Sequence, residues 1–206
     1  MIEYSLIEER IGAFKRDLFE LEEEEIIQKC FQHNMDPVCI SNDTYFLLKS
    51  KISKHFGLHP TDVFMVGSGK LGFTIKPNEQ FRQFGDSSDI DIAIVSEELF
   101  ERFWKAVYLY KNEVKYWPKE ERFKNYLLSG WIRPDLLPPA KRFSEAQEWW
   151  DFFRNLTASG EFGPYKISAG LYYSRFFFES YQKKCITLCK EIIYRESGFL
   201  EDVSNK

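Results

Sequence analysis

Two aspartates separated by one residue stand in a run of isoleucines, which reads Ser88-Asp89-Ile90-Asp91-Ile92-Ala93-Ile94-Val95. Side chains alternate between the two faces of a β-strand, so the isoleucines would share one face and both aspartates the other. Neighbouring carboxylates repel each other unless a cation lies between them or protons neutralise them. Magnesium binds one or two carboxylates and completes its coordination with water and phosphate oxygens. The pair predicts a magnesium site at Asp89 and Asp91; the alternative is the solvated face of an ordinary strand.

A glycine-rich turn, Gly67-Ser68-Gly69-Lys70-Leu71-Gly72, follows residues 62–66, which we predict to be a short buried strand. Glycine lets the backbone approach a ligand closely, and backbone amides with a hydroxyl group bind phosphate. We therefore expect Gly67 and Ser68 to bind phosphate, with Lys70 as a neighbouring cation.

Two other phosphate motifs fit the turn less well. Its spacing matches the dinucleotide fingerprint G-x-G-x-x-G, but that motif must open a helix, and residues 73–77 are typical of a strand broken by proline. A Walker A motif is excluded, because Phe64 stands where glycine is needed and Leu71 where serine or threonine is needed.

Over about residues 62–95, a predicted strand is followed by Gly-Ser, a linking stretch and Ser-Asp-Ile-Asp-Ile-Ala-Ile. This order resembles the signature of the polymerase-beta-like nucleotidyltransferase superfamily. The resemblance implies that Gly67 and Ser68 hold the triphosphate of a nucleotide. It implies that Asp89 and Asp91 bind two magnesium ions, which activate an acceptor hydroxyl and stabilise the leaving pyrophosphate. It also implies a third acidic residue from a later element, for which Asp135 is the candidate.

The activity implied by this resemblance is transfer of a nucleoside monophosphate from a nucleoside triphosphate to a hydroxyl of a protein, an RNA or a small molecule. The alternative is a non-catalytic protein that keeps the fold and binds a nucleotide or a protein partner. The resemblance permits a setting in a toxin and antitoxin pair or in phage defence. Lys76, Arg82 and Arg175 are interpreted as exposed charges, with contact to the triphosphate or the acceptor as the alternative.

Composition limits the class of protein further. The 206 residues suit one domain, and 44% hydrophobic residues supply a core. The net charge of -4 gives no overall basic field, so any contact with nucleic acid must be local. No apolar run approaches the roughly 18 residues of a membrane span, and the N-terminal residues lack the pattern of a secretion signal. We therefore expect a cytoplasmic protein with no membrane contact.

The cysteines Cys30, Cys39, Cys185 and Cys189 are interpreted as reduced core thiols. Zinc at Cys185 and Cys189 would require two further ligands, and no matching histidine pair is present. The aromatic residues near the last helix are also interpreted as core, with stacking on a nucleobase as the alternative; they are Tyr172, Tyr173, Phe176, Phe177, Phe178 and Tyr181.

Periodicity predicts an α+β domain in three parts: N-terminal helices in residues 1–57, a catalytic-type core in 58–140, and C-terminal helices with one strand in 141–206. The resemblance implies a small mixed sheet flanked by helices, as in nucleotidyltransferases. The predicted helices are 2–31, 43–56, 96–117, 119–129, 144–156 and 174–196; the predicted strands are 62–66, 71–75, 88–95 and 165–173. Residues 22–25, all glutamate, are predicted to form the solvated side of the first helix, and Ser144 with Gln147 a capping box.

Overall fold

A four-stranded mixed sheet forms the centre of the computed structural model, which describes residues 4–33, 35–114, 116–139, 141 and 143–196. Its strands are β1 (Val63–Val66), β2 (Ile90–Val95), β3 (Trp131–Ile132) and β4 (Ile167–Tyr172), in the order β1-β2-β4-β3. β2 pairs antiparallel with β1 and parallel with β4, and β3 pairs antiparallel with β4. The predicted α+β class and small mixed sheet are confirmed.

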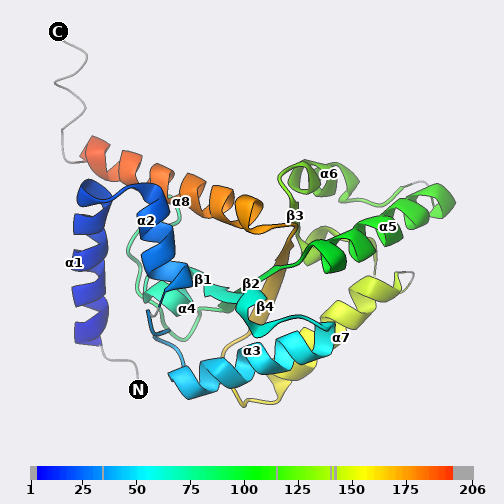
Figure 1. Ribbon diagram of the computed structural model, residues 1–206, viewed down its shortest axis with the longest axis horizontal. Helices are drawn as coiled ribbons and strands as arrows, with labels where there is room; N and C mark the ends of the chain where they lie inside the picture. The colour runs from blue at the N-terminus through cyan, green and yellow to red at the C-terminus, as the bar shows by residue number, and fades with distance from the viewer. Residues whose placement is uncertain (1–3, 34, 115, 140, 142, 197–206) are drawn as a thin grey trace, which may run out of the picture.

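Eight α-helices surround this sheet in the described residues (Figure 1). They are α1 (Tyr4–Glu20), α2 (Glu23–Ile27), α3 (Asn42–Phe56), α4 (Gly67–Leu71), α5 (Glu97–Val114), α6 (Glu120–Leu128), α7 (Ser144–Ala158) and α8 (Arg175–Glu196). A π-helical turn, Gln28–Gln32, continues α2, and two short 3-10 helices cover Pro60–Asp62 and Pro134–Leu136.

One face of the sheet packs against α3, α5 and α7. The alternation predicted for the isoleucine strand is confirmed, because Ile90, Ile92 and Ile94 are all buried in this core. They lie in one apolar cluster with Leu48 of α3, Phe103 of α5 and Trp149 of α7. This cluster fixes β2 in one orientation, since a shift of one residue would turn every isoleucine away from it and toward the opposite face of the sheet.

The opposite face packs against α1, α2 and α8 (Figure 1). Its core includes Ala93 of β2, Tyr172 of β4, Ile7 of α1 and Phe178 of α8. Because side chains alternate along a strand, Asp91 points to this same face. The second face therefore carries both an apolar core and the carboxylate on which the predicted chemistry depends.

The prediction of one helix over residues 2–31 is wrong, because the chain turns at Glu22. The backbone of Glu22 is extended, and its amide donates to Glu25 Oε2 at 3.0 Å, which starts α2 as a separate helix. Negative side chains are favoured at a helix N-terminus. The glutamates also face α8: Glu24 pairs with Lys183 at 2.5 Å and Glu23 with Lys190 at 3.7 Å.

Three further local predictions are wrong. Residues 71–75 form no strand, and Phe73 makes only an isolated bridge to Gln83. Ser144 is the first residue of α7 and its hydroxyl donates to Glu145, so no capping box forms with Gln147. The helical spacing of apolar residues in 174–196 predicts that Leu188 faces inward, but Leu188 is 37% exposed, because the buried side of α8 runs through Ile186 and Cys189.

Other boundaries agree with the predictions. Gly57 ends α3 with a left-handed backbone, and Ser96 accepts the amide of Leu99 at the start of α5.

The four cysteines are free thiols, and Cys30 and Cys189 are buried. Among the described residues, no helix has the length and apolar character needed to cross a membrane.

Candidate functional site

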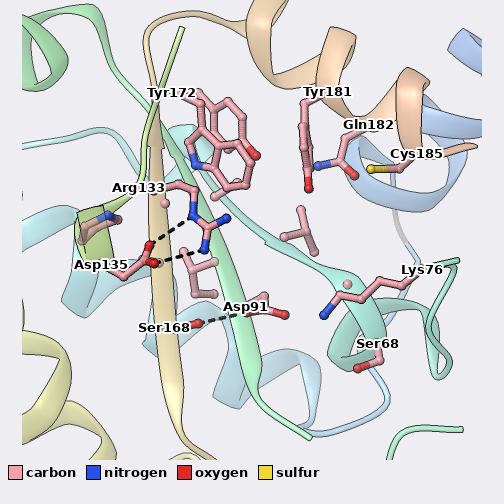
Figure 2. Close-up of a pocket in the computed structure, with 18 of the residues that line it drawn as sticks. Ser68, Lys76, Asp91, Arg133, Asp135, Ser168, Tyr172, Tyr181, Gln182 and Cys185 are labelled. Carbon is pink, nitrogen blue, oxygen red and sulfur yellow. Dashed lines mark hydrogen bonds and ion pairs between the residues drawn. The ribbon is translucent and has the colours of Figure 1, made fainter. Parts of the chain in front are cut away.

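A cavity of about 540 Å³ lies on the second face of the sheet, where β1 ends (Figure 2). Its walls include α4, β2, β3, β4 and α8. Four of the predicted site residues line it, namely Gly67, Ser68, Asp91 and Asp135. Segments far apart in the chain are therefore brought to one space by the pairing of the strands.

Gly67 lies directly against the carboxylate of Asp91. The antiparallel register pairs Val66 of β1 with Asp91 of β2, so the residue after Val66 reaches the aspartate side chain. A β-carbon at Gly67 would lie 3.0 Å from Asp91 Oδ2, and the backbone there has φ +65°. Both the close approach and the left-handed backbone favour glycine. The predicted turn is a single helical turn, α4, which starts at this glycine.

Asp91 is a partly buried carboxylate with a neutral hydrogen-bond partner. Its Oδ1 accepts the hydroxyl of Ser168 at 2.9 Å, because the parallel register places Ser168 of β4 beside it. Burial raises the pKa of Asp91, as does the negative charge of Asp89, while Ser168 and Lys76 act in the opposite direction. In the described part of the chain, no cation lies within 4.0 Å of this carboxylate. A partly buried charge without such a partner is a position that a metal ion would stabilise.

Asp89 lies one residue before β2, and the described lining of the cavity does not include it. Its Oδ2 forms an ion pair with Lys166 Nζ at 3.2 Å, and its side chain is 41% exposed. Lys166 itself lines the cavity. The predicted pair of aspartates is thus divided between one carboxylate that lines the cavity and one that is held at the cavity margin by a lysine.

Asp135 lines the cavity but is paired with an arginine. It stands in the 3-10 helix after β3, and Arg133 Nε and Nη2 donate to its two carboxylate oxygens, each at 3.1 Å (Figure 2). The Nη1 of Arg133 donates to the hydroxyl of Tyr126 at 3.1 Å. This ion pair occupies both carboxylate oxygens of Asp135, and in the part of the chain that the structure describes no three acidic side chains are grouped so that they could hold a metal ion.

Lys70 lies on the other side of α4. Its ammonium is buried and donates to the carbonyl of Met35, and burial lowers the pKa of Lys70 to about 8. It lines a second cavity of about 700 Å³, together with Lys49 and Arg175. The structure therefore separates Lys70 from the cavity of Gly67 and Ser68.

Several lining residues were missed or interpreted otherwise from sequence. Lys76 is exposed, as the sequence predicts, and its side chain also extends toward Asp91 at the cavity (Figure 2). Ser168 carries no acidic group, and only the pairing of β2 with β4 places it at the site. Gln182 of α8 also lines the cavity, and its place on the inner side of α8 was not recognised.

A magnesium ion needs one or two carboxylates and otherwise takes water and phosphate oxygens, and the site predicted at Asp89 and Asp91 stays a prediction. Within the described ranges, no group of three or more histidine, cysteine and acidic residues could hold a metal ion. Of the two aspartates, Asp91 is the one that lines the cavity and has no ion-pair partner among the described residues. The second ion implied by the sequence resemblance stays a prediction.

Comparison of the chain with protein-family models, with curated proteins and with solved structures gives no match. The resemblance of its two motifs to those of nucleotidyltransferases therefore stays a prediction from the sequence.

Proposed function

We propose that this protein is a magnesium-dependent nucleotidyltransferase, which moves a nucleoside monophosphate from a nucleoside triphosphate to an acceptor hydroxyl. The observation that carries the proposal is the contact of Gly67 with the carboxylate of Asp91 inside one cavity. A glycine turn that binds phosphate and a carboxylate that binds magnesium are both needed to hold a triphosphate, and here they are adjacent.

Positive side chains around this contact support the same ligand class. Lys76, Arg133 and Lys166 line the cavity, and a triphosphate carries several negative charges. Cations arranged around a partly enclosed site attract an anionic ligand and raise its local concentration. The amides and hydroxyl at Gly67 and Ser68 would orient the phosphates among these cations.

Asp91 and Asp89 would hold the magnesium ion. For Asp89 this requires the carboxylate to exchange its contact with Lys166 for the ion, which leaves the lysine free for a phosphate oxygen. When bound, the ion supplies positive charge that stabilises the phosphate groups during transfer. The residues of the chain contribute mainly by positioning, since transfer of a phosphoryl group asks for little covalent chemistry from a protein.

The second candidate function is nucleotide binding without transfer. Two observations favour it, because each leaves the site without the third acidic residue that the resemblance implies. The residue beside Asp91 on β4 is Ser168, whose hydroxyl is neutral, and the carboxylate of Asp135 is paired with Arg133. A protein of this kind would act by binding a protein partner, as in a toxin and antitoxin pair or in phage defence.

Pyrophosphate release separates the two functions. The purified chain is incubated with magnesium, candidate acceptors and each of the four nucleoside triphosphates labelled at the α-phosphate. We expect pyrophosphate and a labelled acceptor with the wild type, and a fall of roughly two orders of magnitude for Asp91→Asn, as found when a group that stabilises transition-state charge is removed. The matched control is Asp86→Asn, an exposed carboxylate close in sequence that does not line the cavity.

Equal rates for Asp91→Asn and the wild type would refute the transferase proposal. Tight, magnesium-dependent nucleotide binding with no pyrophosphate from any acceptor would support the binding function instead.

A further inference from the structure

Gln182 is a buried amide that opens into the cavity. Gln182 is 5% exposed, and its side chain lines the cavity. In the described part of the chain, its side-chain amide makes no hydrogen bond. A side-chain amide carries two donor hydrogens and an acceptor oxygen, and buried groups of this kind are almost always paired. The unpaired amide of Gln182 is therefore available to a polar ligand in the cavity.

Three aromatic residues line the same cavity as this amide. Trp131 and Tyr172 are direct partners on β3 and β4, and their rings stack with centroids 5.3 Å apart and 9° between planes. Tyr181 lies 4.5 Å from Trp131, and all three rings line the cavity (Figure 2). Burial raises the pKa of both tyrosines, so their hydroxyls remain neutral. Flat rings beside an unpaired amide suit a planar group with a hydrogen-bonding edge.

The distance from this aromatic end to Asp91 suits a nucleotide. Asp91 pairs with Ser168, and Tyr172 is four residues farther along β4, which corresponds to roughly 13 Å at the usual rise of a strand. A ribose with its phosphate chain can span such a distance. Between the two ends, Ala93 and Gly170 are partners in the register and line the cavity, and the indole nitrogen of Trp131 lies over Gly170, 2.5 Å from where a β-carbon would stand.

Arg133 occupies the space between the two ends. Figure 2 shows its guanidinium between Tyr172 and the carboxylate of Asp91. Its ion pair with Asp135 keeps the guanidinium in place. The cavity thus has an aromatic and amide end, a cation in the middle, and the phosphate and metal end at Gly67 and Asp91.

We propose that Trp131, Tyr172, Tyr181 and Gln182 form a nucleobase subsite, in which the base of the nucleoside triphosphate contacts the rings and its polar edge bonds to Gln182. This proposal rests on the function proposed above, because that function places the phosphates at the other end of the cavity.

The test compares two ligands that share the phosphates and differ in the base. Calorimetric titrations of the full chain with magnesium use a non-hydrolysable nucleoside triphosphate and inorganic tripolyphosphate. We expect the wild type to bind the nucleotide more tightly. Gln182→Met keeps the length of the side chain and removes its hydrogen bonds, and Tyr181→Leu removes a ring. Each should weaken nucleotide binding by roughly 5- to 150-fold, the range for losing a base contact, and leave tripolyphosphate binding unchanged. Gln147→Met, on the exposed side of α7, is the matched control.

Three results would overturn the subsite. Equal affinity of the wild type for the two ligands would mean that the base contributes nothing, and this needs no variant to fold. Unchanged nucleotide affinity in both Gln182→Met and Tyr181→Leu would place the base elsewhere. In either case tripolyphosphate binding still supports the proposed function. If the wild type binds neither ligand, both the subsite and the proposed function fail.

Discussion

An alanine at position 67 would place a methyl group against the carboxylate of Asp91. The methyl carbon would lie 3.0 Å from Asp91 Oδ2, so the carboxylate has to move by a few tenths of an ångström. The backbone of Gly67 has φ +65°, a left-handed conformation that costs an alanine roughly 1–2 kcal/mol. For a chain of this size that cost corresponds to a melting temperature lower by roughly 2–8 °C.

In Gly67→Ala, the free energy of nucleotide binding should fall by more than the free energy of unfolding. If phosphate binds at this turn, the methyl group blocks the approach of a phosphate oxygen to the backbone amides. Loss of one hydrogen bond to a charged group costs about 1.5–3 kcal/mol, which corresponds to roughly a 10- to 150-fold lower affinity. Calorimetry with magnesium and a non-hydrolysable nucleoside triphosphate measures this loss.

Gly160 offers a matched control for the backbone effect. It has the same φ of +65°, and a β-carbon there would meet nothing within 4 Å. Gly160→Ala should therefore lower the melting temperature by the backbone cost alone and leave nucleotide affinity unchanged. If Gly67→Ala and Gly160→Ala bind nucleotide equally well, Gly67 is not part of the phosphate site and our reasoning is wrong.

Three further predictions concern charge and packing. Burial, and to a smaller extent the charge of Asp89, raises the pKa of Asp91. Protonated Asp91 therefore contributes to folding stability, and this contribution is lost as the pH rises through the pKa of Asp91 in the folded protein. Without magnesium, Asp91→Asn should therefore melt at a higher temperature than the wild type at pH 7.5, and the gain should shrink toward pH 3.8, the ordinary pKa; no gain at pH 7.5 would contradict this. Gly130 has φ +61° and lies against the ring of Phe177, so Gly130→Ala should lower the free energy of unfolding by about 2–5 kcal/mol in urea titrations, well beyond Gly160→Ala. Lys70→Met should leave nucleotide affinity within about twofold of the wild type by calorimetry, because the side chain faces another cavity, and a large loss would show that Lys70 reaches the phosphates after all.

Local patterns in the sequence were sufficient to predict many of the helices and strands. The alternation of Ile90, Ile92 and Ile94 predicted β2 and its buried face, because that pattern depends only on the geometry of one strand. Gly57 predicted the end of α3 for a similar reason, since few residues other than glycine adopt a left-handed backbone easily. The contact between Gly67 and Asp91 also followed the expected pairing of two motifs.

Contacts between distant segments could not be predicted in the same way. The parallel pairing of β2 with β4 brings Ser168 to Asp91 across 77 residues, and no local pattern specifies that register. The turn at Glu22 depends on a reciprocal cap that interrupts an otherwise continuous helical pattern. Lys70 was assigned to the phosphate site from its nearness in sequence to Gly67, but one helical turn directs its side chain to the opposite side of α4.

A crystal structure with magnesium and a non-hydrolysable nucleoside triphosphate is the most direct test of the shared phosphate and metal site. We expect a magnesium ion at roughly 2.0–2.1 Å from a carboxylate oxygen of Asp91, with phosphate oxygens at the amides of Gly67 and Ser68. A nucleotide bound instead beside Lys49 and Arg175, with Asp91 still bonded to Ser168 and free of metal, would contradict the proposed site.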